Sequence, residues 1–251
     1  MAKIFYYDSV GLTESTITAG THSSTTFTVS ASAVTNEHYI IDQSIGQAVT
    51  SYDVNDMIRI DLGSSYSGSI DFLLHHNKSA ADETDNLGFY NASSATATGS
   101  LTHLDTTTTP GWNIQNISNS NRYQFIESQE GGFAGLTEII IGTKLTFENE
   151  PDIGIAQQEI FATDINKSYG GVEYANKRHN PQSTWTLNFA NISSAFKGNL
   201  ASMESDVTNF KKFVYYDGSS YHYVRLDAPI KFTEVAYQRF SASLKLREQL
   251  S

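Results

Sequence analysis

Two adjacent histidines, His75 and His76, form with Asn77 the most conspicuous cluster of metal-binding residue types in the chain. Imidazole nitrogens are common metal ligands, so this cluster is a candidate metal site. The apolar run from Ser69 to His75 predicts a β-strand. Neighbouring strand residues point to opposite faces, so both rings could reach one ion only where the strand ends. The alternative is a strand end whose polar side chains hydrogen-bond to loop backbone.

A second candidate metal site is the acidic segment that contains Asp82, Glu83 and Asp85. Carboxylate oxygens are the ligands that Ca²⁺ prefers, and Asp42 or Asp53 could join them. The segment lacks the spacing and the glycine of a helix–loop–helix calcium loop. The alternative is a hydrated acidic turn.

Three aromatic residues, Trp112, Tyr66 and Tyr90, are candidates for ligand binding. Trp112 lies in the turn-rich segment Pro110–Asn113, where its ring could stack on a sugar. Aromatic side chains are more often packed inside proteins, so the alternative is that these rings fill the core.

No spacing of residues predicts catalysis. The segment Gly63–Gly68 differs from the Gly-x-Ser-x-Gly nucleophile elbow, and no strand-to-helix turn follows it. The sequence contains no His-Glu-x-x-His motif, no phosphate-binding loop and no Gly-x-Gly-x-x-Gly motif. Acidic pairs are plentiful, but only geometry could single out a glycosidase pair. We therefore expect no enzymatic activity.

Composition excludes several further classes. The 251 residues include no cysteine, which excludes disulfide scaffolds and thiolate metal sites. The formal net charge of −11 argues against binding of free nucleic acid. No apolar stretch approaches the length of about 20 residues that spans a bilayer, so no membrane insertion is expected. The first residues lack the apolar core of a secretory signal.

Charge is distributed unevenly along the chain. Up to Pro151 there are 17 acidic and 5 basic residues, whereas 10 acidic and 11 basic residues follow. The charged, proline-containing segment Glu148–Asp152 is typical of a linker. We therefore expect two domains, residues 1–150 and residues 151–251.

The first domain is expected to consist of short strands. Alternating or brief apolar runs bounded by turn residues predict strands at Thr26–Ser30, His38–Asp42, Met57–Leu62, Ser69–His75, Leu87–Asn91, Tyr123–Glu127 and Leu136–Gly142. No stretch has sustained helical periodicity. This pattern favours a β-sandwich of the jelly-roll kind.

The second domain combines strands with one helix. Clean alternation at Ser183–Ala190 predicts a strand, and the apolar spacing from Phe196 to Phe210 predicts a helix over residues 193–211. Further strands are expected at Glu159–Asn166, Val172–Tyr174, Phe213–Tyr216, Tyr221–Leu226, Ile230–Tyr237 and Phe240–Leu246. The chain is therefore predicted to be mainly β, with an α+β sandwich and one flanking helix in its second domain.

The second domain resembles tail-tube-like proteins of tailed bacteriophages. The matching segments are Ser183–Ala190, the helix that follows, Lys212–Gly218, Tyr223–Ile230 and Phe240–Glu248. The resemblance implies a β-sandwich with one flanking helix that assembles into rings, usually of six copies, along the tail axis. Distal tail and baseplate hub proteins share this module.

The first domain resembles discoidin or galactose-binding-like jelly rolls. The segments that carry the resemblance are Ile58–Gly63, Ile70–Asn77, Leu87–Asn91 and Leu136–Gly142. It implies a module that often binds cell-surface glycans through its end loops and sometimes holds a structural Ca²⁺. No other cofactor is expected.

A polar segment of the second domain is a candidate contact with a neighbouring subunit. Lys177, Arg178 and His179 lie between predicted strands, and the acidic first domain offers complementary charge. The alternative is a solvated loop. Polar residues occur both at the rims of interfaces and in loops, so residue type does not distinguish the two.

These observations predict a structural protein of a phage tail, near the distal end or baseplate. It is expected to form a homo-oligomeric ring, to dock other tail proteins and to be assembled in the host bacterial cytoplasm into the virion. The jelly roll would serve as a connector or as a glycan-binding platform. The alternatives are a soluble carbohydrate-binding protein or adhesin, and a glycan-degrading enzyme with an unrecognised carboxylate pair.

Overall fold

The structure is a computed structural model. It describes residues 3–51, 55–65, 69–76, 86–97, 101–106, 111–118, 121–128, 135–151, 156–161, 163–178, 180–208 and 210–249. The fold is mainly β, with 54% of the chain in strands and one α-helix among these residues. The predicted mainly β fold with a β-sandwich and one flanking helix is therefore confirmed.

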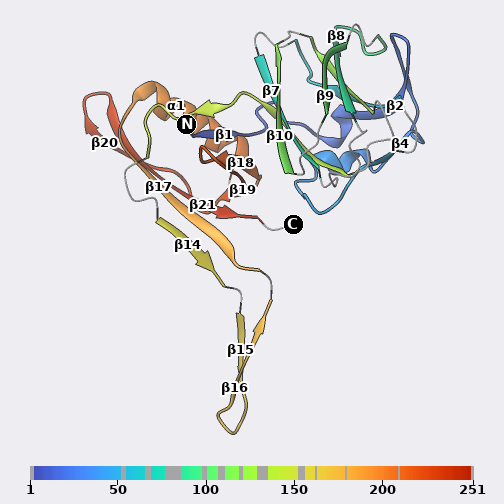
Figure 1. Cartoon of the computed structure of the whole chain (residues 1–251). Helices are drawn as coiled ribbons and strands as arrows, with labels where there is room; N and C mark the ends of the chain where they lie inside the picture. The colour runs from blue at the N-terminus through green and yellow to red at the C-terminus, as the bar shows by residue number, and fades with distance from the viewer. Residues whose placement is uncertain are drawn as a thin grey trace. The chain divides into compact units, whose positions relative to one another are not determined.

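The chain forms two compact units, coloured by sequence in Figure 1. We call Tyr6–Lys144, together with Ser251, the sandwich unit. We call Met1–Phe5 together with Leu145–Leu250 the helix unit. The sandwich unit is thus inserted between the first residues of the chain and the remainder of the helix unit.

The sandwich unit contains a six-stranded sheet in the order β3-β2-β6-β11-β8-β9 and a three-stranded sheet in the order β10-β7-β12. The larger sheet comprises β2 (Ile17–Ser23), β3 (Thr26–Val29), β6 (Asp56–Asp61), β8 (Asn86–Ala92), β9 (Leu101–Thr106) and β11 (Tyr123–Ser128). The smaller sheet comprises β7 (Ser69–His76), β10 (Gly111–Ser118) and β12 (Leu136–Gly142). All described strand pairings in the two sheets are antiparallel.

Short elements complete the sandwich unit. They are the strand pair β4 (Val34–Thr35) and β5 (Thr50–Ser51), and the 3₁₀ helices η1 (Glu14–Thr16) and η2 (Glu37–Ile41). The prediction of a strand at His38–Asp42 is wrong, because η2 occupies most of this segment. Its single fully buried residue, Ile40, reaches the core from a helical turn, and the apolar run alone could not distinguish this from a strand.

The core of the sandwich unit lies between the two sheets. Alternate residues of both sheets point into it, namely Ile17, Ala19, Ile58, Ile60, Phe72, Leu74, Phe89, Ile126, Ile139 and Ile141. A second cluster, of Phe27, Met57, Tyr90, Ala92 and Phe125, covers the opposite face of the larger sheet. The larger sheet therefore packs apolar side chains on both faces.

The helix unit is built on one sheet in the order β13-β1-β18-β19-β21-β17-β14, with β20 also paired to β21. The strands from β18 to β14 in this order, and β1 with β13, pair antiparallel. Its strands are β1 (Ile4–Tyr6), β13 (Leu145–Thr146), β14 (Ala156–Ile160), β17 (Gln182–Ser193), β18 (Phe213–Tyr216), β19 (Tyr221–Leu226), β20 (Lys231–Ala236) and β21 (Arg239–Glu248). A separate two-stranded ribbon, β15 (Thr163–Lys167) and β16 (Glu173–Lys177), continues the chain between β14 and β17.

The helix α1 (Ser194–Val207) covers one face of this sheet and contacts β17 and β21 (Figure 1). Its buried face is Phe196, Leu200, Met203 and Val207, as the apolar spacing predicted. The helix ends before Phe210, because Thr208 adopts a positive φ of 52°. The prediction that Phe210 shares the buried face is therefore wrong, and its side chain is exposed.

The beginning of the helix is held by two side-chain contacts. The Ser193 hydroxyl accepts a hydrogen bond from the Phe196 amide at 3.1 Å, which satisfies one free N–H of the first turn. The same hydroxyl donates to Glu148 Oε2 at 2.6 Å. Glu148 thereby joins the segment after β13 to the start of the helix.

An aromatic cluster in the helix unit explains why the first residues belong to it. Phe5 is fully buried and its ring centroid lies 4.7 Å from that of Phe147 and 5.4 Å from that of Phe213. Phe147 also contacts Phe189 at 5.1 Å. The pairing of Phe5 with Leu145 in β1 and β13 brings these rings together. The compact units divide at Phe5/Tyr6 and at Lys144/Leu145, and the division predicted from the sequence lies after residue 150.

Within the described residues, the structure has no helix of the length and apolar character required to cross a membrane.

Candidate assembly interface

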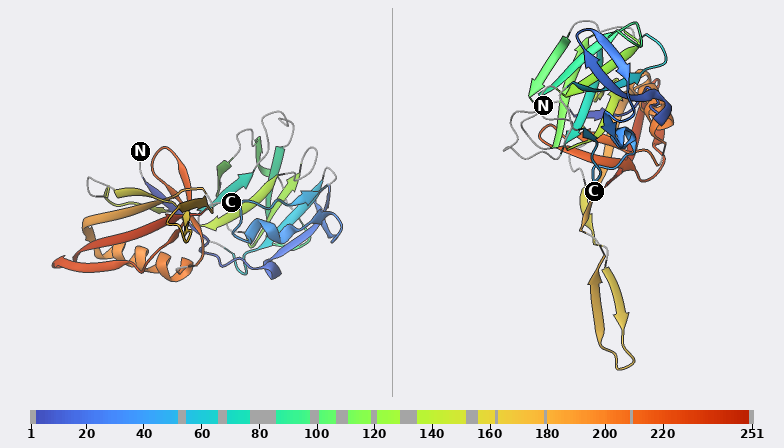
Figure 2. Two further views of the ribbon diagram at one scale, coloured as in Figure 1. Left: turned by 90° about the horizontal axis from the view of Figure 1, so that it is seen from below. Right: turned by 90° about the vertical axis from the view of Figure 1, so that its right-hand side faces the viewer.

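The ribbon of β15 and β16 is the most exposed part of the described chain. We call residues 161–178 the arm. The strands β14 and β17 pair up to Ile160 and Gln182, and the arm continues beyond that end of the sheet (Figures 1 and 2). Every residue of β16 is exposed, as are four of the five residues of β15. The two strands pair only with each other in the described structure.

A tight turn joins the two strands of the arm. The Ser168 amide donates to the Val172 carbonyl at 2.8 Å, and the Ser168 hydroxyl accepts from the Val172 amide at 3.1 Å. Gly171 lies within this turn at a φ of 83°, a left-handed conformation that favours glycine. The sequence therefore closes a hairpin at this point, with Tyr169 at its tip.

Four of the five charged residues of the arm form ion pairs within the arm. Lys167 Nζ lies 3.0 Å from Glu173 Oε1, across the register pair that closes the ribbon. On the other face, the Arg178 guanidinium forms an ion pair with Asp164. These contacts let the arm enter a dry interface without leaving those four charges unpaired.

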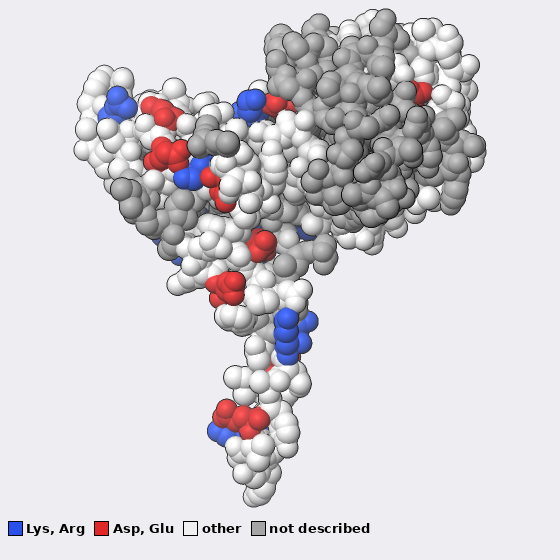
Figure 3. All heavy atoms as spheres, in the orientation of Figure 1, with Lys and Arg blue, Asp and Glu red and all other residues white. Residues whose placement is uncertain are grey.

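The arm also exposes five large apolar side chains. The exposed fractions are 67% for Phe161, 65% for Ile165, 111% for Tyr169, 54% for Val172 and 58% for Tyr174. Figure 3 shows opposite charges side by side on the arm and an uncharged end beyond them. An isolated two-stranded hairpin is at best marginally stable in water, and apolar clusters of this kind mark interaction sites.

The predicted contact residues lie at the base of this arm. Lys177 is the last residue of β16 and donates to Asn180 Oδ1 at 2.7 Å, and Arg178 follows it. His179 lies outside the described residues. The residues predicted from the sequence are the polar ones at the base of the arm, and its apolar residues were not predicted. The sequence feature that could have indicated the apolar residues is a group of four of them around a Gly-Gly turn, namely Ile165, Tyr169, Val172 and Tyr174.

A second exposed apolar patch lies at the turn between β20 and β21. Val235 is 55% exposed and Tyr237 is 87% exposed. Gln238 adopts a φ of 55° in this turn and donates to the Tyr237 hydroxyl at 3.3 Å. We call residues 235–238 the hairpin tip.

Tyr90, a candidate ligand-binding residue, is buried in the sandwich unit. Its hydroxyl donates to Glu127 Oε2 at 2.6 Å, and Glu127 Oε1 lies 2.5 Å from His22 Nδ1. The ring is part of the cluster with Phe27, Met57 and Phe125, so a sugar could stack on it only if this cluster opened. Tyr66 lies outside the described residues.

Trp112, the other candidate, is half-buried in β10 and pairs in register with His75. The two rings meet edge to face, with centroids 5.0 Å apart. His75 Nδ1 lies 2.6 Å from the Thr137 hydroxyl. Burial and the nearby His76 lower the pKa of His75 to about 4, so His75 is neutral at pH 7.

The acidic candidates Asp82, Glu83 and Asp85 lie outside the described residues, as does Asp53. Asp42 accepts a hydrogen bond from the Ser44 amide at 2.7 Å, which stabilises a local turn. Across the described ranges, no group of three or more histidine, aspartate or glutamate side chains is placed to hold a metal ion.

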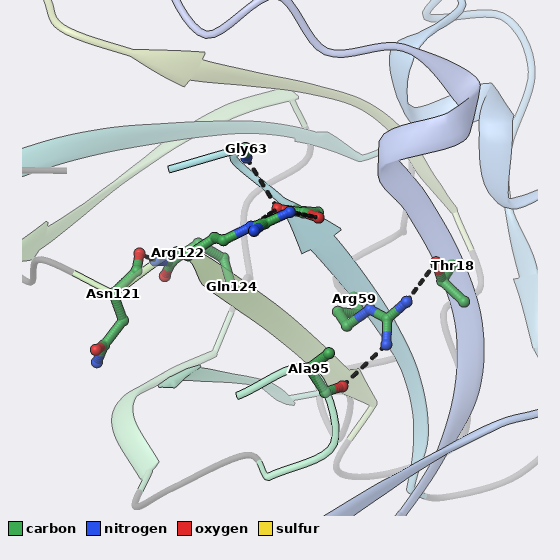
Figure 4. A network of polar contacts seen from close by, with 8 residues as sticks. Thr18, Arg59, Gly63, Ala95, Asn121, Arg122 and Gln124 are labelled. Carbon is green, nitrogen blue, oxygen red and sulfur yellow. Dashed lines mark hydrogen bonds and ion pairs between the residues drawn. The ribbon is translucent and has the colours of Figure 1, made fainter. Parts of the chain in front are cut away.

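Two arginines on the outer face of the larger sheet form a polar network that the sequence analysis did not predict (Figure 4). Arg122 forms a bidentate ion pair with Asp61 at 2.6 and 2.7 Å, and this contact holds the pKa of Asp61 below its usual value. Arg59 donates to the Ala95 carbonyl at 2.9 Å and to the Thr18 hydroxyl at 3.0 Å. The Arg59 guanidinium also lies 5.1 Å from the Phe27 ring centroid. The network therefore fastens the segment after β8 to the sheet.

Comparison with known proteins identifies no family. No protein-family model matches the chain, and no curated protein is significantly similar to it.

Proposed function

We propose that this chain is a structural subunit of a bacteriophage tail, in the distal tail or baseplate region, that assembles into a ring. In this proposal the arm is the main contact between neighbouring copies. The observation that carries it is the exposed apolar surface of the arm, formed by Phe161, Ile165, Tyr169, Val172 and Tyr174. No chemical step is required, and the protein acts by assembly.

The physical support is that, among the described residues, no second layer of strands or helices covers the arm. A two-stranded ribbon cannot bury its apolar side chains, because each face needs a second layer of structure. Its two outer edges also carry backbone groups that another chain can pair with. Docking on a neighbouring copy would bury the apolar side chains and pair the backbone groups of the outer edges.

Charge favours self-association through the helix unit. The helix unit has 12 acidic and 12 basic residues, whereas the sandwich unit has 15 acidic and 4 basic residues. Two sandwich units repel each other at low salt, and two helix units do not. The sandwich unit then serves as the connector to other tail proteins, or as a platform for a cell-surface glycan.

The order of elements also agrees with the resemblance to tail-tube-like proteins. A long strand, β17, is followed by the helix α1 and then by β18, β19, β20 and β21 in one sheet. In the proposal, neighbouring copies meet head to tail, which closes a ring when the rotation between them closes. The resemblance implies six copies, assembly in the bacterial cytoplasm and a final place in the virion tail.

Light scattering coupled to size exclusion tests the proposal. At micromolar concentration we expect the full chain to elute as a closed oligomer, and the double variant Ile165→Asp/Tyr169→Asp to elute as a monomer. The matched control is Val29→Asp, because Val29 is 61% exposed on β3, an edge strand of the sandwich unit. An unaltered chain that stays monomeric at every concentration would contradict the proposal.

A further inference from the structure

Two apolar patches of the described helix unit, the arm and the hairpin tip, lie at opposite ends of one strand pair. In the register of β17 and β21, Thr184 lies opposite Arg247 near the arm, and Ser193 lies opposite Arg239 beside the hairpin tip. The 11 steps from Gln182 to Ser193 along β17 correspond to about 36 Å at strand spacing. Figure 1 shows the β20–β21 turn and the arm at these two ends.

The arm of a chain is too short to reach the hairpin tip of the same chain. The arm extends from Phe161 to Tyr169, which spans at most about 29 Å when fully extended. A path back along the sheet would also need a reversal at the base of the arm. Contact between the two patches therefore requires two copies of the chain.

The combined area of the two patches matches an ordinary interface. A fully exposed aromatic side chain presents about 200 Å², and an aliphatic one about 100 Å². Tyr174 pairs with Asn166 and therefore lies on the opposite face of the ribbon from Ile165. With their exposed fractions, the other four apolar residues of the arm together with Val235 and Tyr237 present about 700 Å². Apolar atoms form a little over half of a typical interface, so burial of these residues corresponds to about 1,200 Å² in total. A stable protein interface buries about 1,200–2,000 Å².

We propose that the hairpin tip of one copy receives the arm of the next copy, so that Tyr169 and Ile165 pack against Val235 and Tyr237. This inference rests on the proposed function and names the two halves of its contact. The contact joins two different surfaces of the same chain, so each copy has one arm to give and one tip to occupy. Repetition of such a contact produces a ring or an open filament.

The paired charges of the arm fit this arrangement. Lys167 and Glu173 already neutralise each other, as do Asp164 and Arg178. Burial of the arm beside a largely apolar tip therefore leaves no charge of these two pairs without its partner.

Mixing of two assembly-defective variants tests the inference. The arm variant carries Ile165→Asp/Tyr169→Asp, and the tip variant carries Val235→Asp/Tyr237→Asp. All four side chains are more than half exposed, so both variants are expected to fold, which circular dichroism and thermal unfolding check. We expect each variant alone to be monomeric, with a dissociation constant raised at least about 30-fold, as for loss of an interface hot spot.

An equimolar mixture should restore one contact, because the arm variant has an intact tip and the tip variant has an intact arm. We expect native mass spectrometry of tag-distinguished chains to find the 1:1 heterodimer and no larger ring. A mixture that stays monomeric would overturn the inference, as would a tip variant that still forms the unaltered oligomer. In the second case the proposed function would survive, whereas a monomeric unaltered chain would overturn both.

Discussion

Strand β7 of the sandwich unit and strand β16 of the arm are both paired strands, yet they differ completely in burial. The six residues from Asp71 to His76 in β7 are all buried, and the five residues of β16 are all exposed. β7 lies between β10 and β12 in its sheet and packs Phe72 and Leu74 into the core. In the part of the chain that the structure describes, β16 has one neighbouring strand, β15, and no second layer covers it.

The comparison separates what stabilises a strand from what a strand offers to a partner. Each buried apolar side chain of β7 contributes about 1.5–3 kcal/mol through removal from water. The exposed side chains of the arm contribute almost nothing to the isolated chain, so that energy remains available for association. The substitutions below test this difference between buried and exposed residues, beginning with the largest expected change in unfolding free energy.

Phe72→Ala should lower the free energy of unfolding of the sandwich unit by about 3–5 kcal/mol, because it leaves a cavity between the two sheets. Urea denaturation followed by the fluorescence of Trp112 measures this change, in a Trp185→Phe background. The helix unit, followed by Trp185 in a Trp112→Phe background, should keep its transition. A change below about 1 kcal/mol would show that the core tolerates the loss.

Phe5→Ala should lower the free energy of unfolding of the helix unit by about 3 kcal/mol, at the lower end for a buried aromatic residue because the chain end can relax. Phe5 contacts Phe147 and Phe213 and is far from both in sequence. The Trp185 transition should move and the Trp112 transition should not. The opposite result would place the first strand with the sandwich unit.

Asp217→Ala should destabilise the helix unit by about 1–3 kcal/mol at pH 7, as for loss of hydrogen bonds to a charged group. Burial alone would raise the pKa of Asp217, but His222 at 3.0 Å and the donors of Ser219 and Ser220 lower it well below its usual value. A depressed carboxylate pKa stabilises the fold above about pH 4, and the effect is lost as the pH falls further.

The pH dependence supplies the control for this carboxylate. The difference in unfolding free energy between the unaltered chain and Asp217→Ala should be largest at neutral pH and should shrink below about pH 4. A difference that stays constant from pH 7 to pH 2.5 would assign the loss to the turn geometry alone.

Ser193→Ala should lower the stability of the helix unit by about 1 kcal/mol through loss of the helix cap. Ser194, the first residue of α1, is exposed and provides the matched control. Ser194→Ala should change the transition by less than about 0.5 kcal/mol. If the two substitutions lowered the stability equally, the loss could not be assigned to the Ser193 cap.

Ile165→Asp should have the smallest effect on the isolated chain, within about 0.5 kcal/mol of the unaltered unfolding free energy. Its exposed position in the arm is the physical reason. Dilute samples measured by circular dichroism test this point. A loss above about 1 kcal/mol would show that the arm packs on its own chain.

Elements with strong periodicity could be predicted from the sequence. The alternation in β17 and the apolar spacing of α1 located both elements to within a few residues, because each buries one face against a layer. The 3₁₀ helix η2 and the exposed Phe210 were predicted wrongly, since a short apolar run or stripe does not fix where a helix ends.

Long-range pairing could not be read from local patterns. The pairing of Ile4 with Thr146 joins residues separated by the whole sandwich unit. The candidate interface was located at Lys177 and Arg178, but its apolar residues were missed. Tyr169 is exposed because no second layer covers the arm in the described structure, and no local sequence pattern indicates this.

Hydrogen–deuterium exchange of β15 and β16 as a function of protein concentration tests the central claim most directly. If the arm docks on another copy, its amides should exchange rapidly in dilute solution and at least about tenfold more slowly once the oligomer forms. The amides of β7 should be protected at every concentration and provide the internal reference. Exchange in the arm that remains fast and independent of concentration would contradict the account.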